Sequence, residues 1–189
     1  MKKTKAIDMH RLTVEEFHKA PKQPLVVVVD NVRSAYNVGS IFRTADAFRI
    51  EKIYLCGITA CPPNTEIHKT ALGGEDSVDW EYAEDTKKVV EKLHRDGYTV
   101  YAVEQAEGST SLTEFMPTVE NRIHNRETEP EKRAIIMGNE VKGVQQEVVD
   151  MCDGCIEIPQ WGTKHSLNVS VAAGIVIWQL SNLIDIYYQ

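Results

Sequence analysis

Three short segments of this 189-residue chain combine polar side chains with glycines in patterns that suit a ligand site. They are residues 30–48 (DNVRSAYNVGSIFRTADAF), 138–144 (GNEVKGV) and 158–178 (IPQWGTKHSLNVSVAAGIVIW). Each follows a run that reads as a β-strand, and α/β proteins place their sites in the loops after parallel strands. Arg43 could bind an anion and Glu140 could bind a ligand. Alone, each also has a plainer interpretation as a solvated side chain of the surface.

The third segment opens a very apolar helix with the small polar residues Ser166, Asn168 and Ser170. Helix capping is the simplest explanation of these residues, with Ser166 expected at the N-cap. The helix that follows, predicted over residues 167–187, is apolar almost all the way round. A helix of this kind must be buried in the core or against a partner.

Several common motifs are absent from the sequence. No G-x-G-x-x-G follows a predicted strand, no G-x-x-x-x-G-K-[ST] is present, and no G-x-S-x-G is present. Cys152 and Cys155 form a single C-x-x-C, whereas a structural zinc site needs a second pair of ligands. We therefore expect neither a metal nor a dinucleotide site of the usual kind.

The elements that must position these segments alternate between strand and helix, which predicts a parallel α/β sheet. The strands are expected to be buried because their apolar residues run continuously. Residues 68–82 carry no assigned chemistry, and residues 118–133 are polar and without pattern. Strands are predicted at 25–30, 52–57, 98–104, 133–138 and 154–158, and helices at 37–49, 85–96 and 167–187.

The composition describes a soluble globular chain with a formal net charge of −7. No apolar run approaches the roughly 18 residues of a membrane span, and no signal-peptide pattern opens the chain, so we expect a cytoplasmic protein. Residues 1–24 differ from the rest, with six lysines and arginines against three carboxylates. A basic segment on an acidic body can contact phosphate.

Taken together and in order, the three segments resemble the motifs of the SPOUT methyltransferases, in particular the SpoU (TrmH-like) branch, which methylates ribose 2′-hydroxyls in tRNA and rRNA. The resemblance covers about residues 25–183. It implies an α/β, Rossmann-like domain with a parallel sheet and a C-terminal deep trefoil knot. It also implies S-adenosyl-L-methionine as cofactor, RNA as partner and a homodimer through the C-terminal helix. Residues 1–24 would form a basic N-terminal extension, and residues 25–189 the methyltransferase domain.

The resemblance also assigns roles to individual residues. Because a guanidinium stays protonated, we expect Arg43 to stabilise the developing alkoxide and to orient a phosphate rather than to act as the base. The catalytic residues implied are Arg43, Asn37, Glu140, Ser166 and Asn168. The cofactor-binding residues implied are Gly138, Asn139, Gly143, Ile158 and Leu167.

Two other functions remain open at this point: methylation of an RNA base, and a catalytically silent knotted module that only binds RNA. Trp161 could stack on a base or pack within the protein. The polar segment 118–133 could contact RNA or be a solvated loop. Because this segment is basic, we expect deletion of residues 1–22 to lower the affinity for RNA and to make that affinity less dependent on salt concentration.

Overall fold

The computed structural model describes residues 1, 3, 11–114 and 131–181. Within these residues, seven strands form one sheet in the order β3-β2-β1-β6-β4-β7-β5, and every neighbouring pair is parallel. The predicted parallel α/β sheet is therefore confirmed. The strands are β1 (Gln23–Asp30), β2 (Ile50–Cys56), β3 (Trp80–Ala83), β4 (Thr99–Val103), β5 (Thr110–Ser111), β6 (Arg133–Met137) and β7 (Gly154–Glu157).

The order of the strands in the sheet differs from their order in the sequence, and this difference brings distant loops together. β6 lies between β1 and β4, and β7 lies between β4 and β5, so two late strands enter between earlier ones. The carboxyl ends of β1, β6, β4 and β7 consequently meet at one edge of the sheet. The three segments singled out in the sequence all leave the sheet at this edge.

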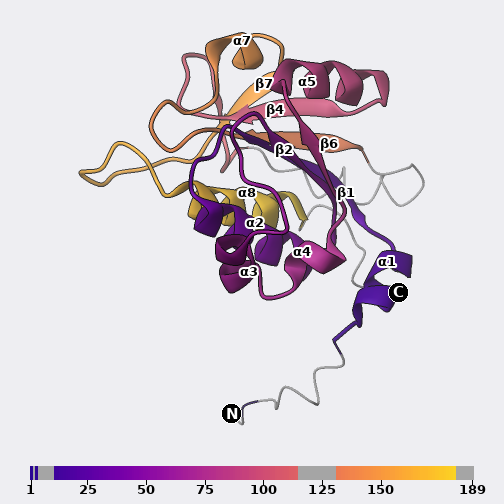
Figure 1. Cartoon of the computed structure of the whole chain (residues 1–189). Coiled ribbons are helices and arrows are strands. Elements are labelled where there is room, and N and C mark those ends of the chain that lie inside the picture. The colour runs from indigo at the N-terminus through magenta and orange to yellow at the C-terminus, as the bar shows by residue number, and fades with distance from the viewer. Residues whose placement is uncertain (2, 4–10, 115–130, 182–189) are drawn as a thin grey trace.

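Helices cover both faces of the sheet (Figure 1). α2 packs against α3, α4 and α8 on one face, and α5 lies beside α7 on the other. Each face has its own cluster of buried apolar side chains, and the sheet separates the two clusters. The helices are α1 (Val14–Lys19), α2 (Ala35–Ala47), α3 (Thr65–Ala71), α4 (Gly74–Ser77), α5 (Thr86–Arg95), α7 (Gln146–Val149) and α8 (Val169–Ser181).

Helix α2 forms where the apolar spacing predicts it, two residues earlier than expected. The side chain of Ser34 accepts a hydrogen bond from the Asn37 amide and caps the helix, which sets its start at Ala35. Val38, Ile41, Phe42 and Ala45 are buried, as the pattern predicts. Arg43 lies on the opposite, solvent-exposed side of the helix.

Helix α8 begins at Val169, and the prediction of Ser166 as its N-cap is wrong. The side chain of Asn168 accepts from the amides of Ser170 (2.9 Å) and Val171 (3.4 Å), so the cap lies two residues later. An asparagine oxygen satisfies the unpaired amides of a first turn as well as a serine oxygen does. Residues 182–187 of the predicted helix lie outside the described residues.

The other predicted elements also have their counterparts. In α5, Val89, Val90 and Leu93 are buried, as the amphipathic pattern indicates. Residues 68–82 hold parts of α3, α4 and β3, none of which the sequence analysis predicted, because these elements are short and lack a long periodic run. Residues 118–130 of the polar segment lie outside the described residues.

The amino-terminal segment is tied to the rest of the fold through α1. Thr13 and Glu16 form a capping box at its start, and Phe17 is buried in the same core cluster as β1 and α2. α1 also contacts α4. None of the described helices is long and apolar enough to span a membrane.

Candidate active site

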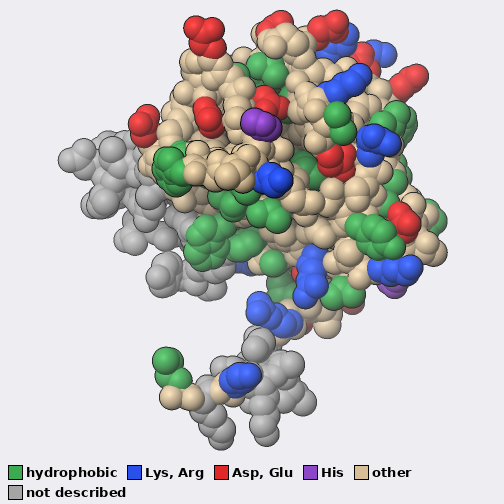
Figure 2. Space-filling model, turned by 90° about the vertical axis from the view of Figure 1, so that its left-hand side faces the viewer, with side chains coloured by type: hydrophobic (Ala, Val, Ile, Leu, Met, Phe, Trp, Pro, Cys, Tyr) green, Lys and Arg blue, Asp and Glu red, His purple; other side chains and the backbone are tan. Residues whose placement is uncertain are grey.

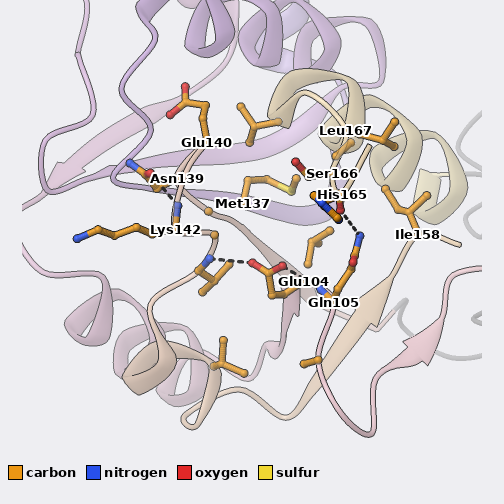
Figure 3. A pocket seen from close by; sticks show the side chains of 18 of the residues that line it. Glu104, Gln105, Met137, Asn139, Glu140, Lys142, Ile158, His165, Ser166 and Leu167 are labelled. Atoms are coloured by element: carbon orange, nitrogen blue, oxygen red, sulfur yellow. Dashed lines mark hydrogen bonds between the residues drawn. The ribbon is translucent and has the colours of Figure 1, made fainter. Parts of the chain in front are cut away.

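A cavity of about 1040 Å³ opens at the carboxyl edge of the sheet. Its lining comes from three loops: the one after β4, the one between β6 and α7, and the one that leads from β7 into α8 (Figure 3). The lining mixes apolar side chains such as Met137, Ile158 and Leu167 with carboxylates and amides. A cavity of this size and character suits a small-molecule ligand.

The loop after β6 is a tight hairpin that requires its glycines. The amide of Asn139 donates to the Gly143 carbonyl and the amide of Gly143 donates to the Asn139 carbonyl, both at 2.9 Å. Gly143 has a φ of +67°, a conformation that favours glycine. A Cβ on Gly138 would overlap the backbone of Gly143 and Val144. The two strands of this hairpin therefore approach more closely than any side chain would allow.

The side chain of Asn139 shapes the same hairpin from inside. Its Nδ2 donates to the carbonyl of Asn31 (2.7 Å), and its Oδ1 accepts from the amides of Val141 (2.9 Å) and Lys142 (3.2 Å). These bonds fix the loop to the end of β1. Asn139, expected to bind cofactor, thus has its amide group committed to holding the loop that lines the cavity.

Two acidic residues to which the sequence analysis assigned no role hold the loops at this edge of the sheet. Glu104 follows β4 and accepts from the amides of Val144 (3.1 Å) and Gln105 (2.9 Å). In Figure 3 its carboxylate lies between the hairpin and Gln105. A carboxylate placed directly after a buried strand was the available signal, because the predicted strand 98–104 ends on it.

Asp30, the second of these acids, ends β1 and is 0% exposed. Its carboxylate accepts from Thr86 Oγ1 (2.6 Å), Gln145 Nε2 (3.0 Å) and Asn31 Nδ2 (2.9 Å). A buried polar group is tolerated only when its hydrogen-bonding capacity is satisfied in this way. Asp30 therefore joins the loop after β1, the start of α5 and the start of α7.

A chain of hydrogen bonds links the three segments that the sequence brought to attention. Glu140 Oε1 accepts from Asn37 Nδ2 at 3.0 Å, and Asn37 Oδ1 accepts from Asn168 Nδ2 at 3.1 Å. Residues more than 100 positions apart are thereby joined beside the cavity. The side-chain amide of Asn37 donates to Glu140 and accepts from Asn168 at the same time, so it fixes the positions of both side chains.

The carboxylate of Glu140 also caps α2. Its two oxygens accept from the amides of Arg33 and Ser34, each at 3.0 Å. Partial burial by itself would raise the pKa of Glu140, but the hydrogen bonds from these amides and from Asn37 outweigh it and leave the pKa below its usual value. Glu140 is therefore ionised near neutral pH and sits at the positive end of the helix dipole.

The structure brings most of the expected site residues together. Asn37 lies outside the lining but is bonded to it through Glu140 and Asn168. Arg43 does not line the cavity; it lies on the exposed side of α2, about 9 Å further along the helix axis than Asn37. Of the expected site residues, those that line the cavity are Gly138, Asn139, Glu140, Gly143, Ile158, Ser166, Leu167 and Asn168.

Arg43 is nevertheless placed to meet an anion. Among the described residues its guanidinium makes no hydrogen bond or ion pair, and the side chain faces solvent. An unpaired guanidinium presents five donors in a planar fork that matches a phosphate or a developing alkoxide. The exposed face of α2 thus offers a cation outside the cavity lining, on the helix whose start is bonded to Glu140.

Cys152 and Cys155 are free thiols, both partly buried. Burial raises the pKa of Cys152 to about 12 and also raises the pKa of Cys155, which disfavours the thiolate that metal binding needs. Within the described part of the chain, no group of three or more His, Cys, Asp or Glu side chains could hold a metal ion.

The fold and the cavity define a parallel α/β protein with a small-molecule site at the carboxyl ends of its strands. The model of the SpoU rRNA Methylase family matches residues 24–178, and the chain belongs to this family. The expected family is therefore confirmed.

The chain is also similar to individual proteins of known name and to solved structures. The chain is 28% identical over 172 residues to a tRNA (guanosine(18)-2′-O)-methyltransferase of Thermus thermophilus, covering 91% of this chain and 81% of the relative. It is 30% identical over 164 residues to an enzyme of the same name from Aquifex aeolicus, covering 84% of this chain and 69% of the relative. The crystal structure of AdoMet-bound rRNA methyltransferase from Sinorhizobium meliloti superposes with a TM-score of 0.73 at 27% identity. That alignment covers 86% of this chain and 57% of the other.

Proposed function

We propose that the chain transfers a methyl group from S-adenosyl-L-methionine to a ribose 2′-hydroxyl of tRNA or rRNA. The observation that carries this proposal is the hydrogen-bonded chain Glu140–Asn37–Asn168 beside the cavity. It unites the three family segments in one site. The named relatives are 2′-O-methyltransferases of RNA, and a structural neighbour binds AdoMet.

The cavity fits this cofactor in size and in chemistry. Gly138 lets two backbone strands close over one side, and Ile158 and Leu167 supply apolar surface. Glu104 and Glu140 bring negative charge near a ligand that carries a sulfonium. We propose that Gly138, Asn139, Gly143, Ile158 and Leu167 hold the cofactor. S-adenosyl-L-methionine, when bound, supplies an electrophilic methyl group.

Transfer makes a carbon–oxygen bond, breaks a carbon–sulfur bond and releases the hydroxyl proton. We propose that Arg43 stabilises the negative charge that develops on the ribose oxygen, since a guanidinium remains charged and cannot accept the proton. An RNA phosphate oriented by Arg43 takes the proton. Asn37, Glu140 and Asn168 hold the loops that position the ribose, Ser166 lines the cavity beside them, and this positioning supplies much of the rate.

We also propose a C-terminal deep trefoil knot and a homodimer. The knot is supported by the strand order, because β6 and β7, which come late in the chain, lie between strands that come earlier.

The dimer is supported by an exposed apolar stripe on α8. Sedimentation equilibrium at micromolar concentration should show a particle of twice the chain mass. A monomer at these concentrations would contradict it. The stripe consists of Val171, Ile175 and Trp178.

The proposed activity is tested by methyl transfer from labelled S-adenosyl-L-methionine to total RNA from cells that lack this gene. The RNA is separated into tRNA and rRNA and digested to nucleosides. Label in a 2′-O-methylnucleoside is the expected result. Label in a methylated base would replace ribose by base methylation, and cofactor binding without any label would favour the silent RNA-binding module. We expect the activity to reside in the cytoplasm.

The basic residues of the proposed extension 1–24 are expected to contribute to RNA affinity. Deletion of residues 1–22 would also remove Phe17 from the core, so neutralisation is the cleaner test. We expect the quadruple variant Lys2→Gln, Lys3→Gln, Lys5→Gln, Arg11→Gln to bind tRNA more weakly. The negative slope of log affinity against log salt should become less steep by up to about 3 to 4, because each phosphate contact contributes about −0.7 to −0.9 to it. An unchanged slope would remove this segment from the RNA interface.

A further inference from the structure

The loop that leads from β7 into α8 projects from the molecule beside the cavity. Figure 1 shows it as the yellow-orange segment that extends beyond the sheet just before α8, and Figure 2 views the molecule from this side. Both ends of the loop are fixed. Ile158 packs against the core, and the carbonyl of His165 accepts from Gln105 Nε2 at 2.9 Å. The residues between these two anchors are exposed to solvent, while the two ends of the loop are fixed to the rest of the protein.

Trp161 lies in this projecting part and is 89% exposed. The exposure excludes a packing role for its indole within a single chain. Isolated exposed hydrophobic residues are common on protein surfaces, so exposure alone indicates no function. The position is informative, because the neighbouring Gln160 and the later His165 and Ser166 all line the cavity.

The charges of the loop also favour a polyanionic partner. Residues 159–165 include Lys164 and His165 but no carboxylate, in a chain whose net charge is −7. Lys142 lies on the hairpin across the cavity. Gly162 has no neighbouring atoms within 4 Å of where a Cβ would stand, so the loop is open to approach next to the indole. A cation beside an accessible aromatic ring is the combination that binds unpaired nucleotides.

We propose that Trp161 is a stacking platform for a nucleobase next to the methylated ribose. This inference rests on the proposed function, and it adds a residue that holds the RNA rather than the cofactor. A ribose that presents its hydroxyl to the cavity keeps its own base and the adjacent nucleotides near the rim, and Gln160 and His165 on either side of the projecting residues belong to the cavity lining. Stacking uses the π-face that every base has, so Trp161 supplies affinity without selecting a sequence.

Three substitutions separate stacking from other roles. Trp161→Ala removes the ring, Trp161→Leu keeps an apolar side chain without a π-face, and Trp161→Phe keeps a smaller aromatic ring. We expect Ala and Leu to raise KM for the RNA fraction that accepts methyl groups by between roughly 5-fold and 150-fold, the range of one stacked base. Phe should stay within about threefold of the native enzyme, and the Kd for S-adenosyl-L-methionine should not change in any variant.

A direct binding measurement keeps the test independent of methyl transfer. Adding bulk tRNA should quench the tryptophan fluorescence of the native chain, and most of this quenching should be lost in Trp161→Phe but kept in Trp80→Phe. Trp80 is the control, because it lies on the edge strand β3 away from the cavity and packs, partly buried, against the core. Failure of the native chain to transfer methyl groups would overturn the proposed function while leaving this quenching interpretable.

Three outcomes would overturn the stacking role. The first is an unchanged KM in Trp161→Ala. The second is Leu performing as well as Phe, which would assign the effect to apolar contact alone. The third is a change in sedimentation of Trp161→Ala, which would place the indole against a second copy of the chain instead of RNA.

Discussion

Replacing Arg43 with alanine is expected to lower kcat for methyl transfer by a factor of about 10² to 10³ while leaving the Kd for S-adenosyl-L-methionine within about twofold. Removal of one donor that stabilises a developing oxyanion typically costs this much. Cofactor affinity is spared because Arg43 lies outside the cavity lining, on the exposed side of α2. Transfer kinetics with saturating RNA, together with calorimetric titration of the cofactor, measure both quantities.

Two further variants define what Arg43 supplies. Arg43→Lys keeps the charge without the planar fork and should recover only part of the rate. Arg95→Ala is the matched control, since Arg95 is also an exposed helical arginine but belongs to α5 on the other face of the sheet. It should keep native turnover. A near-native kcat in Arg43→Ala would remove this residue from the chemistry.

The second large effect is expected from Gly138→Ala, which should weaken S-adenosyl-L-methionine binding by a factor of ten or more. The added Cβ would overlap backbone atoms of Gly143 and Val144. Backbone cannot move aside as a flexible side chain can, so the hairpin 138–144 must open. That movement would also disturb the bond from the Val144 amide to Glu104.

Gly162→Ala is the control for this substitution. No atom lies within 4 Å of its added Cβ, and its backbone has no positive φ that only glycine favours. Cofactor affinity should therefore stay native. Circular dichroism and thermal unfolding establish whether Gly138→Ala is folded at the temperature of the titration. A folded Gly138→Ala chain with native cofactor affinity would contradict the assignment of this hairpin to the cofactor site.

The sequence determined the class of fold because the signals for it are local. A short, continuous β-branched run such as LVVVV at 25–29 favours a buried strand, and the spacing of Val38, Ile41, Phe42 and Ala45 gives α2 one apolar side. Alternation of such strands and helices leaves a parallel sheet as the natural arrangement. The motif segments were also visible, since glycines and asparagines in fixed order are properties of the chain.

The site depends on contacts that the linear sequence does not record. Nothing near Glu104 in the sequence indicates that its carboxylate holds the amide of Val144, 40 positions later. Asn168 reads as one of several small polar residues before a helix, and its cap of α8 and its bond to Asn37 distinguish it from Ser166 only in the folded chain. The Ser166 cap was wrong for the same reason: several side chains could cap α8, and the position of the loop decides among them.

The sequence by itself thus determined the parallel α/β class, the buried strands and the three segments that carry the chemistry, since these follow from short-range periodicity and composition. Only the tertiary structure decided that Glu140 caps α2, that Asn37 joins Glu140 to Asn168, and that Arg43 stands outside the cavity. The physical reason lies in the sheet order. When β6 enters between β1 and β4, loops more than 100 residues apart meet at one edge, and their hydrogen bonds form only there.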